Sequence, residues 1–471
     1  MLTTSPTTTP FAQPALDQLR AQLQGAVHVP GEAGYDDARR AWNLAISQHP
    51  AIIVAAQRPA DVAAAVRFAQ AQGLGVAVQS TGHGVVRPAD GALLILTAPM
   101  AAVRVDAAAQ TAWVEAGALW GAVLEKAQAV GLAPLLGSSP GVGVVGYTLG
   151  GGLGWLARKY GLAADSVRAF EGVTAEGELR RASAAENADL FWALRGGGGA
   201  FAIVTGLEIQ LYPVTTVVGG NLIYPIELAR EVITRYRAWI ASAPDELTSS
   251  VVIMNFPPVP DVPEFLRGRS AVIVRGLYCG PVAEGEALLR YWRDWRAPLA
   301  DLFRTMPFAE VATVSNDPRD PLPGYSSGAW LRELSDDAIT ALIEYGVARP
   351  GVPGVVFAEV RHIGGAVARA DRRASAFGGR DAELLLSVIG VTPTAEARRQ
   401  VAAHVAQLKR AMSASLTGSV YMNFLDGDES RARTADAYRP EDYQRLQRLK
   451  IQYDPHNRLS FSFNIPPAAN S

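Results

Sequence analysis

Residues 137–154 read GSSPGVGVVGYTLGGGLG, a stretch rich in glycine and free of charge. Its glycines from Gly141 to Gly146 have GxGxxG spacing, but a Rossmann turn also needs a buried strand before the motif and a helix after it. Pro140 precedes the motif, and a helix through residues 150–152 would cost about 1 kcal/mol per glycine relative to alanine. We therefore predict a long, bare backbone loop that lies against an extended cofactor.

Upstream of this loop, residues 79–84 read QSTGHG and follow a short predicted strand at 76–78. Small residues let backbone N–H groups approach a phosphate or pyrophosphate closely. His83 would then stand at the rim of an anion site. The alternative is a tight turn that carries a surface histidine.

The C-terminal segment carries a third group of polar and aromatic residues, from Tyr421 and Asn423 to the run SFNIPP at 462–467. If residues 421–424 form a strand, Tyr421 and Asn423 point to the same face, because side chains alternate along a strand. A tyrosine and an amide on one face can line a site. The alternative is an ordinary strand with one polar face.

Short strands and helices alternate in the first half of the chain. Apolar runs predict strands at 52–55, 76–78, 93–96, 112–115 and 203–211, and apolar periodicity predicts helices at 15–24, 59–73 and 119–130. Pro213 stops the last of these strands. Beyond it the predicted elements are longer, such as a strand at 270–278 and a helix at 283–295. Residues 1 to about 14 look disordered.

Composition excludes several classes of protein. The chain has 471 residues, which predicts two or three domains, and its 43 basic and 45 acidic residues show no basic run of the kind that binds nucleic acid. No apolar stretch is long enough to span a membrane, and no secretory signal precedes the first helix. The single cysteine, Cys279, excludes an internal disulfide and a cysteine metal cluster. We expect a cytoplasmic protein without a metal site.

Together, these segments resemble the vanillyl-alcohol oxidase / p-cresol methylhydroxylase flavoproteins, and among them the berberine-bridge-enzyme-like oxidases. The resemblance covers about residues 51–213 and 421–467, and EVRHIGGA at 359–366 resembles a substrate-domain strand and its turn. It implies an α+β fold with a PCMH-type FAD-binding domain of two α/β subdomains. A substrate domain with a mainly antiparallel sheet covered by helices completes the expected fold.

The same resemblance implies that the chain is divided into four parts. They are an N-terminal segment at 1–45, the FAD-binding domain at 46–214, the substrate-binding domain at 215–415, and a berberine-bridge-like segment at 416–471 that returns to the FAD domain.

The resemblance further implies that FAD is bound covalently, with His83 bonded to its 8α-methyl group. Gln79, Thr81 and Gly84 differ from the usual loop, which has an arginine, a glycine and a serine there. Ser139 stands where many relatives carry a second, cysteine link, so a single link is expected. The other residues expected at the cofactor are Ser80, Thr81, Gly82, Gly84, Ser138, Ser139, Gly143, Gly146, Tyr147, Ile203, Val204 and Asn464.

By the same resemblance, Tyr421 is the first candidate for the catalytic base over the flavin ring. A tyrosine has an ordinary pKa near 10, so a neighbour must favour the tyrosinate. Arg361 or His362 could do so, but alternation along a strand lets only one of them face the ring. The alternative for Arg361 is an ion pair with Glu359. Phe424 occupies a position where relatives carry a second tyrosine, which argues against a two-tyrosine base.

Three functions follow from these expectations. The first is an oxidase that takes a hydride from a C–OH or C–N carbon of a small natural product or sugar, in secondary metabolism, and passes electrons to O₂. The second is a flavin dehydrogenase with another acceptor, because Trp155 matches a position where bulk hinders oxygen. The third is a non-catalytic flavin- or ligand-binding protein. The expected partners are a small-molecule substrate and O₂, with no nucleic acid and no membrane, in a monomer or homodimer.

Overall fold

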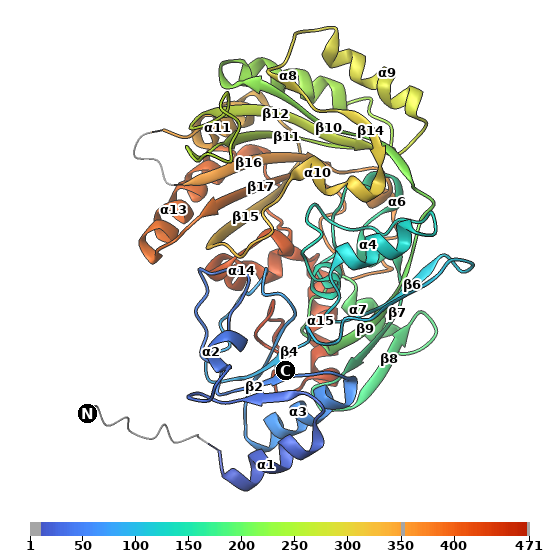
Figure 1. Cartoon of the computed structure of the whole chain (residues 1–471), viewed down its shortest axis with the longest axis vertical. Coiled ribbons are helices and arrows are strands. Elements are labelled where there is room, and N and C mark those ends of the chain that lie inside the picture. The colour runs from blue at the N-terminus through green and yellow to red at the C-terminus, as the bar shows by residue number, and fades with distance from the viewer. Residues whose placement is uncertain (1–10, 350–353, 469–471) are drawn as a thin grey trace.

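The computed structural model describes residues 11–349 and 354–468. Figure 1 shows two lobes, one built mainly from the first half of the chain and one from residues 216–412. The C-terminal segment runs back from the second lobe into the first. No helix within the described ranges is both long and apolar enough to cross a bilayer.

The first sheet has the strand order β1-β2-β4-β3, with β2 and β3 parallel to β4 and β1 antiparallel to β2. The strands predicted at 52–55, 76–78 and 93–96 are confirmed. The expected disorder to about residue 14 is wrong from residue 11 onward, because Phe11 is buried and a helix starts at Gln13; residues 1–10 lie outside the described ranges. The elements are β1 Ala26–His28, β2 Ile52–Ala55, β3 Val76–Gln79, β4 Leu93–Leu96, α1 Gln13–Gln22, α2 Tyr35–Ala38 and α3 Pro59–Ala71.

The second sheet is antiparallel, with the order β5-β6-β9-β7-β8. Its strands are β5 Val103–Asp106, β6 Thr111–Glu115, β7 Val167–Val173, β8 Leu179–Ser183 and β9 Ile203–Gln210. Its helices are α4 Trp120–Gln128, α5 Val144–Leu149, α6 Ala157–Tyr160, α7 Ala188–Leu194 and, from the end of the chain, α15 Pro440–Tyr453. One continuous hydrophobic core joins these elements to the first sheet.

The quoted glycine-rich stretch does not form a Rossmann turn. Only an isolated bridge between Leu119 and Gly143 precedes the short helix α5, where a Rossmann turn needs a strand. After α5 the chain leaves the helix at once, because Gly151 and Gly152 have φ angles of 105° and 76°, which favour glycine.

The third sheet is antiparallel, with the order β13-β10-β12-β11-β16-β17-β15 and β14 paired with β10. Helices α8, α9, α11 and α13 cover one face, where their apolar side chains share a core with the strands (Figure 1). The strands are β10 Thr216–Pro225, β11 Leu247–Asn255, β12 Ser270–Tyr278, β13 Ala300–Asp301, β14 Arg304–Pro307, β15 Gly324–Leu331, β16 Val355–His362 and β17 Leu384–Val391. The helices are α8 Ala229–Ile240, α9 Val282–Arg293, α10 Ala312–Ser315, α11 Asp336–Gly346, α12 Ala366–Arg369 and α13 Ala395–Ala411. This architecture confirms the expected α+β fold class.

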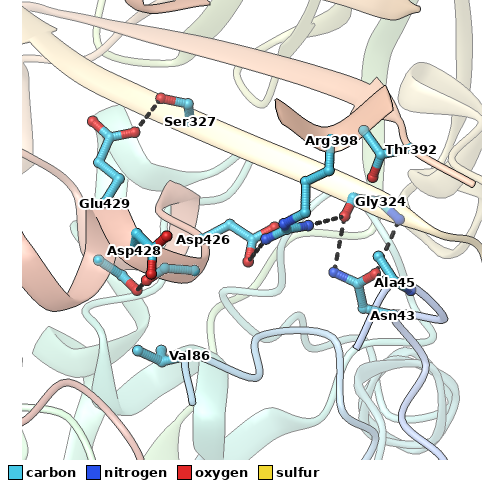
Figure 2. A network of polar contacts seen from close by, with 12 residues as sticks. Asn43, Ala45, Val86, Gly324, Ser327, Thr392, Arg398, Asp426, Asp428 and Glu429 are labelled. Atoms are coloured by element: carbon cyan, nitrogen blue, oxygen red, sulfur yellow. Dashed lines mark hydrogen bonds and ion pairs between the residues drawn. The ribbon is translucent and has the colours of Figure 1, made fainter. Parts of the chain in front are cut away.

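Polar contacts join the two lobes around helix α14, Gly427–Arg433 (Figure 2). Asp426 accepts an ion pair from Arg398 of α13 at 2.8 Å. Arg398 also donates to the Gly324 carbonyl, which accepts a second bond from the Asn43 amide, and the Gly324 N–H donates to the Asn43 amide oxygen. The C-terminal segment is therefore held by the substrate-domain sheet on one side and lies against the N-terminal lobe on the other.

Candidate active site

The loop at 80–84 and the glycine-rich stretch lie side by side. A Cβ added at Gly143 would meet the Ser80 hydroxyl oxygen at 3.0 Å, and that hydroxyl is buried without a hydrogen-bond partner. Gly84 and Gly146 have open space where a side chain would be. The backbone at Gly84 and Gly146 therefore borders open space, in the same loops as a buried hydroxyl without a partner.

A second set of polar atoms lies where the C-terminal run meets the glycines after α7. A Cβ at Gly199 would meet the Ser462 hydroxyl at 3.6 Å, and the Ser462 hydroxyl and Asn464 amide oxygen are buried without partners. Both residues line a cavity of about 510 Å³ together with Arg87 and Arg431. Buried polar atoms without partners are rare in proteins. Bare backbone, free hydroxyls and nearby arginines fit a nucleotide with a pyrophosphate, so the residues present fit FAD.

His83 lies in the loop at 80–84, beside the glycine-rich stretch, and lines neither cavity. Its ring stacks on Trp42 with centroids 4.2 Å apart, and Nδ1 lies 2.8 Å from the Thr81 hydroxyl. Gly82 beside it has φ 82°, and a Cβ there would meet Ala41 at 2.7 Å. Burial lowers the pKa of His83 to about 4, so the imidazole is neutral at pH 7 and keeps a lone pair.

The expected strand at 421–424 is wrong: Met422–Phe424 forms a 3₁₀ turn, closed by a hydrogen bond from the Phe424 N–H to the Tyr421 carbonyl. Tyr421 and Asn423 still meet, because the Asn423 amide donates to the Tyr421 phenol oxygen at 3.0 Å. The same amide donates to the Tyr147 carbonyl at 2.9 Å. Tyr421 and Asn423 therefore lie together as expected, but a direct hydrogen bond within the turn joins them, and not a shared face of a strand.

The phenol oxygen of Tyr421 accepts a second N–H bond, from the backbone of Leu153 at 3.1 Å. Tyr421 is 1% exposed, and burial raises its pKa to about 12, although both donors and Arg361 favour the tyrosinate. Two N–H groups aimed at one oxygen form the kind of arrangement that stabilises a developing oxyanion.

Aromatic side chains surround this phenol. Phe424, Trp330 and Phe377 have ring centroids 5.0, 5.7 and 6.0 Å from that of Tyr421. Tyr147 has a buried hydroxyl without a partner, and burial raises its pKa well above 10. The surroundings are therefore apolar except for a few directed polar groups.

Arg361 and His362 are neighbours at the end of strand β16 and point to opposite faces of the sheet. Arg361 lines a second cavity together with Ser138, Leu153 and Trp155. His362 points to the opposite face of the strand, where Nε2 lies 2.9 Å from Arg158. Burial and the Arg158 charge lower the pKa of His362 to about 3. Of the two, only Arg361 is placed to act on Tyr421.

Glu359 pairs with Arg361 as the sequence-based alternative expected, and with a second arginine that sequence reasoning missed. Arg361 Nε lies 2.7 Å and Arg275 Nη2 lies 2.6 Å from the Glu359 carboxylate. Arg275 stands in a largely apolar strand. Only the alternation of side chains along that strand could have placed Arg275 on the sheet face that carries Glu359. The buried charges therefore form an Arg–Glu–Arg cluster.

Among the predicted cofactor residues, Asn464 lines the first cavity and Ser138 the second, and the others, Ile203 and Val204 among them, line neither. These two lie in β9, and their side chains pack in the core of the N-terminal lobe. Ser139 lies in the glycine-rich loop beside Ser138, and its hydroxyl accepts from the Gly141 N–H at 3.4 Å.

Replacing Glu359 should destabilise the fold strongly. The two arginines lower the pKa of Glu359 from 4.5 to about 2 against the opposing effect of burial. The ionised Glu359 carboxylate therefore stabilises the fold fully above pH 4.5, and this stabilisation is lost as the pH falls toward 2. We expect Glu359→Gln to lower the free energy of unfolding at pH 7 by about 3–5 kcal/mol, because it leaves two buried guanidinium groups uncompensated.

Thermal unfolding between pH 3 and pH 7 measures this effect. The variant should show less change in melting temperature with pH than the wild type. Glu286→Gln is the control, because its ion pair with Arg293 is exposed and contributes about 0–1 kcal/mol. Equal melting temperatures for Glu359→Gln and Glu286→Gln at pH 7 would contradict the role of the cluster.

Two family models and several relatives match the chain. Residues 50–183 match the family model described as FAD binding domain, and residues 420–466 match that described as berberine and berberine like. The chain is 28% identical over 463 residues to an FAD-linked oxidoreductase of Bacillus subtilis, covering 96% of this chain and 99% of that one. It is also 28% identical to (R)-6-hydroxynicotine oxidase of Paenarthrobacter nicotinovorans, covering 94% and 97%.

Solved structures show the same fold. The crystal structure of 6-hydroxy-D-nicotine oxidase from Arthrobacter nicotinovorans superposes with a TM-score of 0.84 and 26% identity, covering 97% of this chain and 100% of that one. Carbohydrate oxidase from Microdochium nivale has a TM-score of 0.82 and 24% identity over the same shares, which shows the fold alone.

Proposed function

We propose that this chain is an oxidase of small molecules, of the FAD-linked, berberine-bridge-enzyme-like kind that the family models and relatives support. It takes a hydride from a C–OH or C–N carbon of a small natural product or sugar and passes the electrons to O₂. The observation that carries the proposal is the Tyr421 phenol oxygen, which receives two N–H bonds close to a cavity shared by the glycine-rich stretch and the substrate-domain sheet.

FAD, when bound, supplies the hydride acceptor. The chain's own task is to take the proton that leaves the substrate's oxygen or nitrogen, and the Tyr421 phenol oxygen is the group that takes it. The Leu153 N–H and the Asn423 amide hold this oxygen in place and stabilise its negative charge. Burial keeps the pKa of Tyr421 at about 12, so the tyrosinate that acts as base becomes more abundant as the pH rises.

A single covalent link to FAD through His83 is the second part of the proposal. A neutral imidazole has the lone pair that a bond to the flavin methyl needs, and the low pKa of His83 keeps it neutral. Cys279, the only cysteine, is buried in the substrate domain, where burial raises the pKa of its thiol to about 12. Ser139 lies in the glycine-rich loop, where serine cannot form the second link. A solved relative, glucooligosaccharide oxidase of Acremonium strictum, carries a 6-S-cysteinyl, 8α-N1-histidyl FAD.

A flavin dehydrogenase is the second candidate, and Trp155 is the observation that favours it. Trp155 lines the cavity with Leu153 and Arg361, is 5% exposed, and has an indole N–H without a partner. A bulky ring at this position would limit the approach of O₂. A binding protein without catalysis is disfavoured, because it has no use for the donors around Tyr421.

Anaerobic reduction followed by mixing with O₂ tests the proposal. The purified protein should carry flavin, lose its yellow colour with a substrate from a panel of alcohols, amines and sugars, and regain it in O₂ with one H₂O₂ formed per substrate oxidised. Fast return of colour with a quinone or dye but not with O₂ would establish the dehydrogenase instead. Protein purified without flavin would contradict both.

A further inference from the structure

The buried charges beside the second cavity do not balance. Glu359 is fully buried, and both of its oxygens are engaged: Oε1 by Arg275, at 3.1 Å from Nε and 2.6 Å from Nη2, and Oε2 by Arg361 Nε at 2.7 Å. Arg275 is 3% exposed and the Arg361 side chain 14%. One carboxylate therefore faces two guanidinium groups, and the cluster carries a net charge of +1.

The antiparallel register holds this cluster in place. Ser250 of β11 lies directly opposite Arg275 of β12 on one side and Arg361 of β16 on the other. The Ser250 hydroxyl accepts from Arg275 Nε at 3.3 Å. Arg275 Nε and Nη2 are thereby engaged inside the sheet, and Arg361 is the guanidinium of the cluster that lines the second cavity.

The guanidinium of Arg361 has free donors at the cavity. Only its Nε makes a hydrogen bond among the described residues, so both Nη groups are without a partner there. The guanidinium lies 5.0 Å over the ring of Phe424. Asp317, in a loop after α10, acts on Arg361 only through space, without an ion pair. A half-buried arginine with two free Nη groups is suited to an anion with two oxygens.

We propose that Arg361 binds a carboxylate of the substrate, so that the substrate class is a small organic acid with an apolar or aromatic body. This cavity has a volume of only about 10 Å³, so it admits the carboxylate end, and the body extends outward past Leu153, Trp155 and Ile363, which line it. A neutral sugar or alcohol would offer the two Nη groups of Arg361 no charged acceptor when it displaces water from them, which costs free energy. The inference rests on the proposed function in taking this cavity as the substrate site.

Ligand titration of the flavin-loaded protein tests the inference. The probes are benzoate, phenylacetate and 3-phenylpropionate, each matched with its carboxamide, and the visible spectrum of the flavin reports binding. We expect at least one acid to bind about 10- to 100-fold more tightly than its amide, the range expected for a charge-assisted hydrogen bond. Arg361→Gln should abolish this preference, with affinity for the amide changed less than about threefold.

Two variants separate charge from folding. Arg361→Lys keeps the positive charge but loses the planar pair of Nη donors, and it should retain part of the preference for the acid. Arg293→Gln, in an exposed ion-pair cluster on α9, should bind acids as the wild type does. Acids that bind no better than their amides, or an unchanged preference in flavin-loaded Arg361→Gln, would overturn the inference and leave the proposed function standing. Absence of flavin from the wild-type protein would instead contradict the proposed function.

Discussion

His83→Ala should release the flavin completely when the protein is precipitated with acid, whereas the wild-type pellet stays yellow. His83 is the one histidine of the chain in a loop of small residues beside the glycine-rich stretch, with its ring fixed by Trp42 and Thr81. Removing its lone pair removes the nucleophile, but the backbone cradle around Ser80 and Gly143 remains. We therefore expect flavin still to bind, without a covalent bond, and fluorescence on a denaturing gel to be lost.

His404→Ala is the matched control, because His404 lies on α13 and contacts only the Tyr345 carbonyl and ring. Its flavin should remain attached. The pKa of about 4 adds a pH dependence: when FAD is added to apoprotein, the covalent bond should form above about pH 5 and fail below pH 4, where the imidazole is protonated. Covalent flavin in His83→Ala, found by mass spectrometry on any peptide, would refute the assignment.

Tyr421→Phe should slow flavin reduction by about 10²–10⁴-fold, the usual contribution of a general base. The variant keeps the buried ring and its aromatic contacts but removes the oxygen that accepts from Leu153 and Asn423. Stopped-flow mixing with substrate under anaerobic conditions measures the rate. Flavin content and the rate of reoxidation by O₂ should stay near the wild-type values, because the hydroxyl acts only on the proton of the substrate.

The pH profile separates a base from a packing residue. Since burial holds the pKa of Tyr421 at about 12, the wild-type reduction rate should rise with pH above 7, and Tyr421→Phe should lose this rise. Tyr278→Phe is the control, because it removes a hydroxyl that donates to Glu284 and lines neither cavity. Reduction of folded, flavin-loaded Tyr421→Phe at the wild-type rate would rule out the base role.

Local patterns of apolar residues were sufficient to predict several strands of the fold. The strands at 52–55, 93–96 and 270–278 appear where apolar runs placed them, because a buried strand depends on its own run of apolar side chains. The rejection of a Rossmann turn at the glycine-rich stretch also held, since Pro140 and the glycines at 150–152 are local obstacles to that geometry. Turn geometry at 421–424 was mispredicted, because a hydrogen bond to the distant Leu153 helps to position Tyr421.

The sequence by itself, through its resemblance to known flavoproteins, predicted FAD binding and the α+β class, and side-chain alternation allowed only one of Arg361 and His362 to face the cavity. Only the tertiary structure decided which one, because the choice depends on which face of β16 the helices cover. The same holds for Arg275, whose partner Glu359 lies two strands away in the sheet. Periodicity along a chain tells which side chains share a face, but the packing of distant segments decides what that face meets.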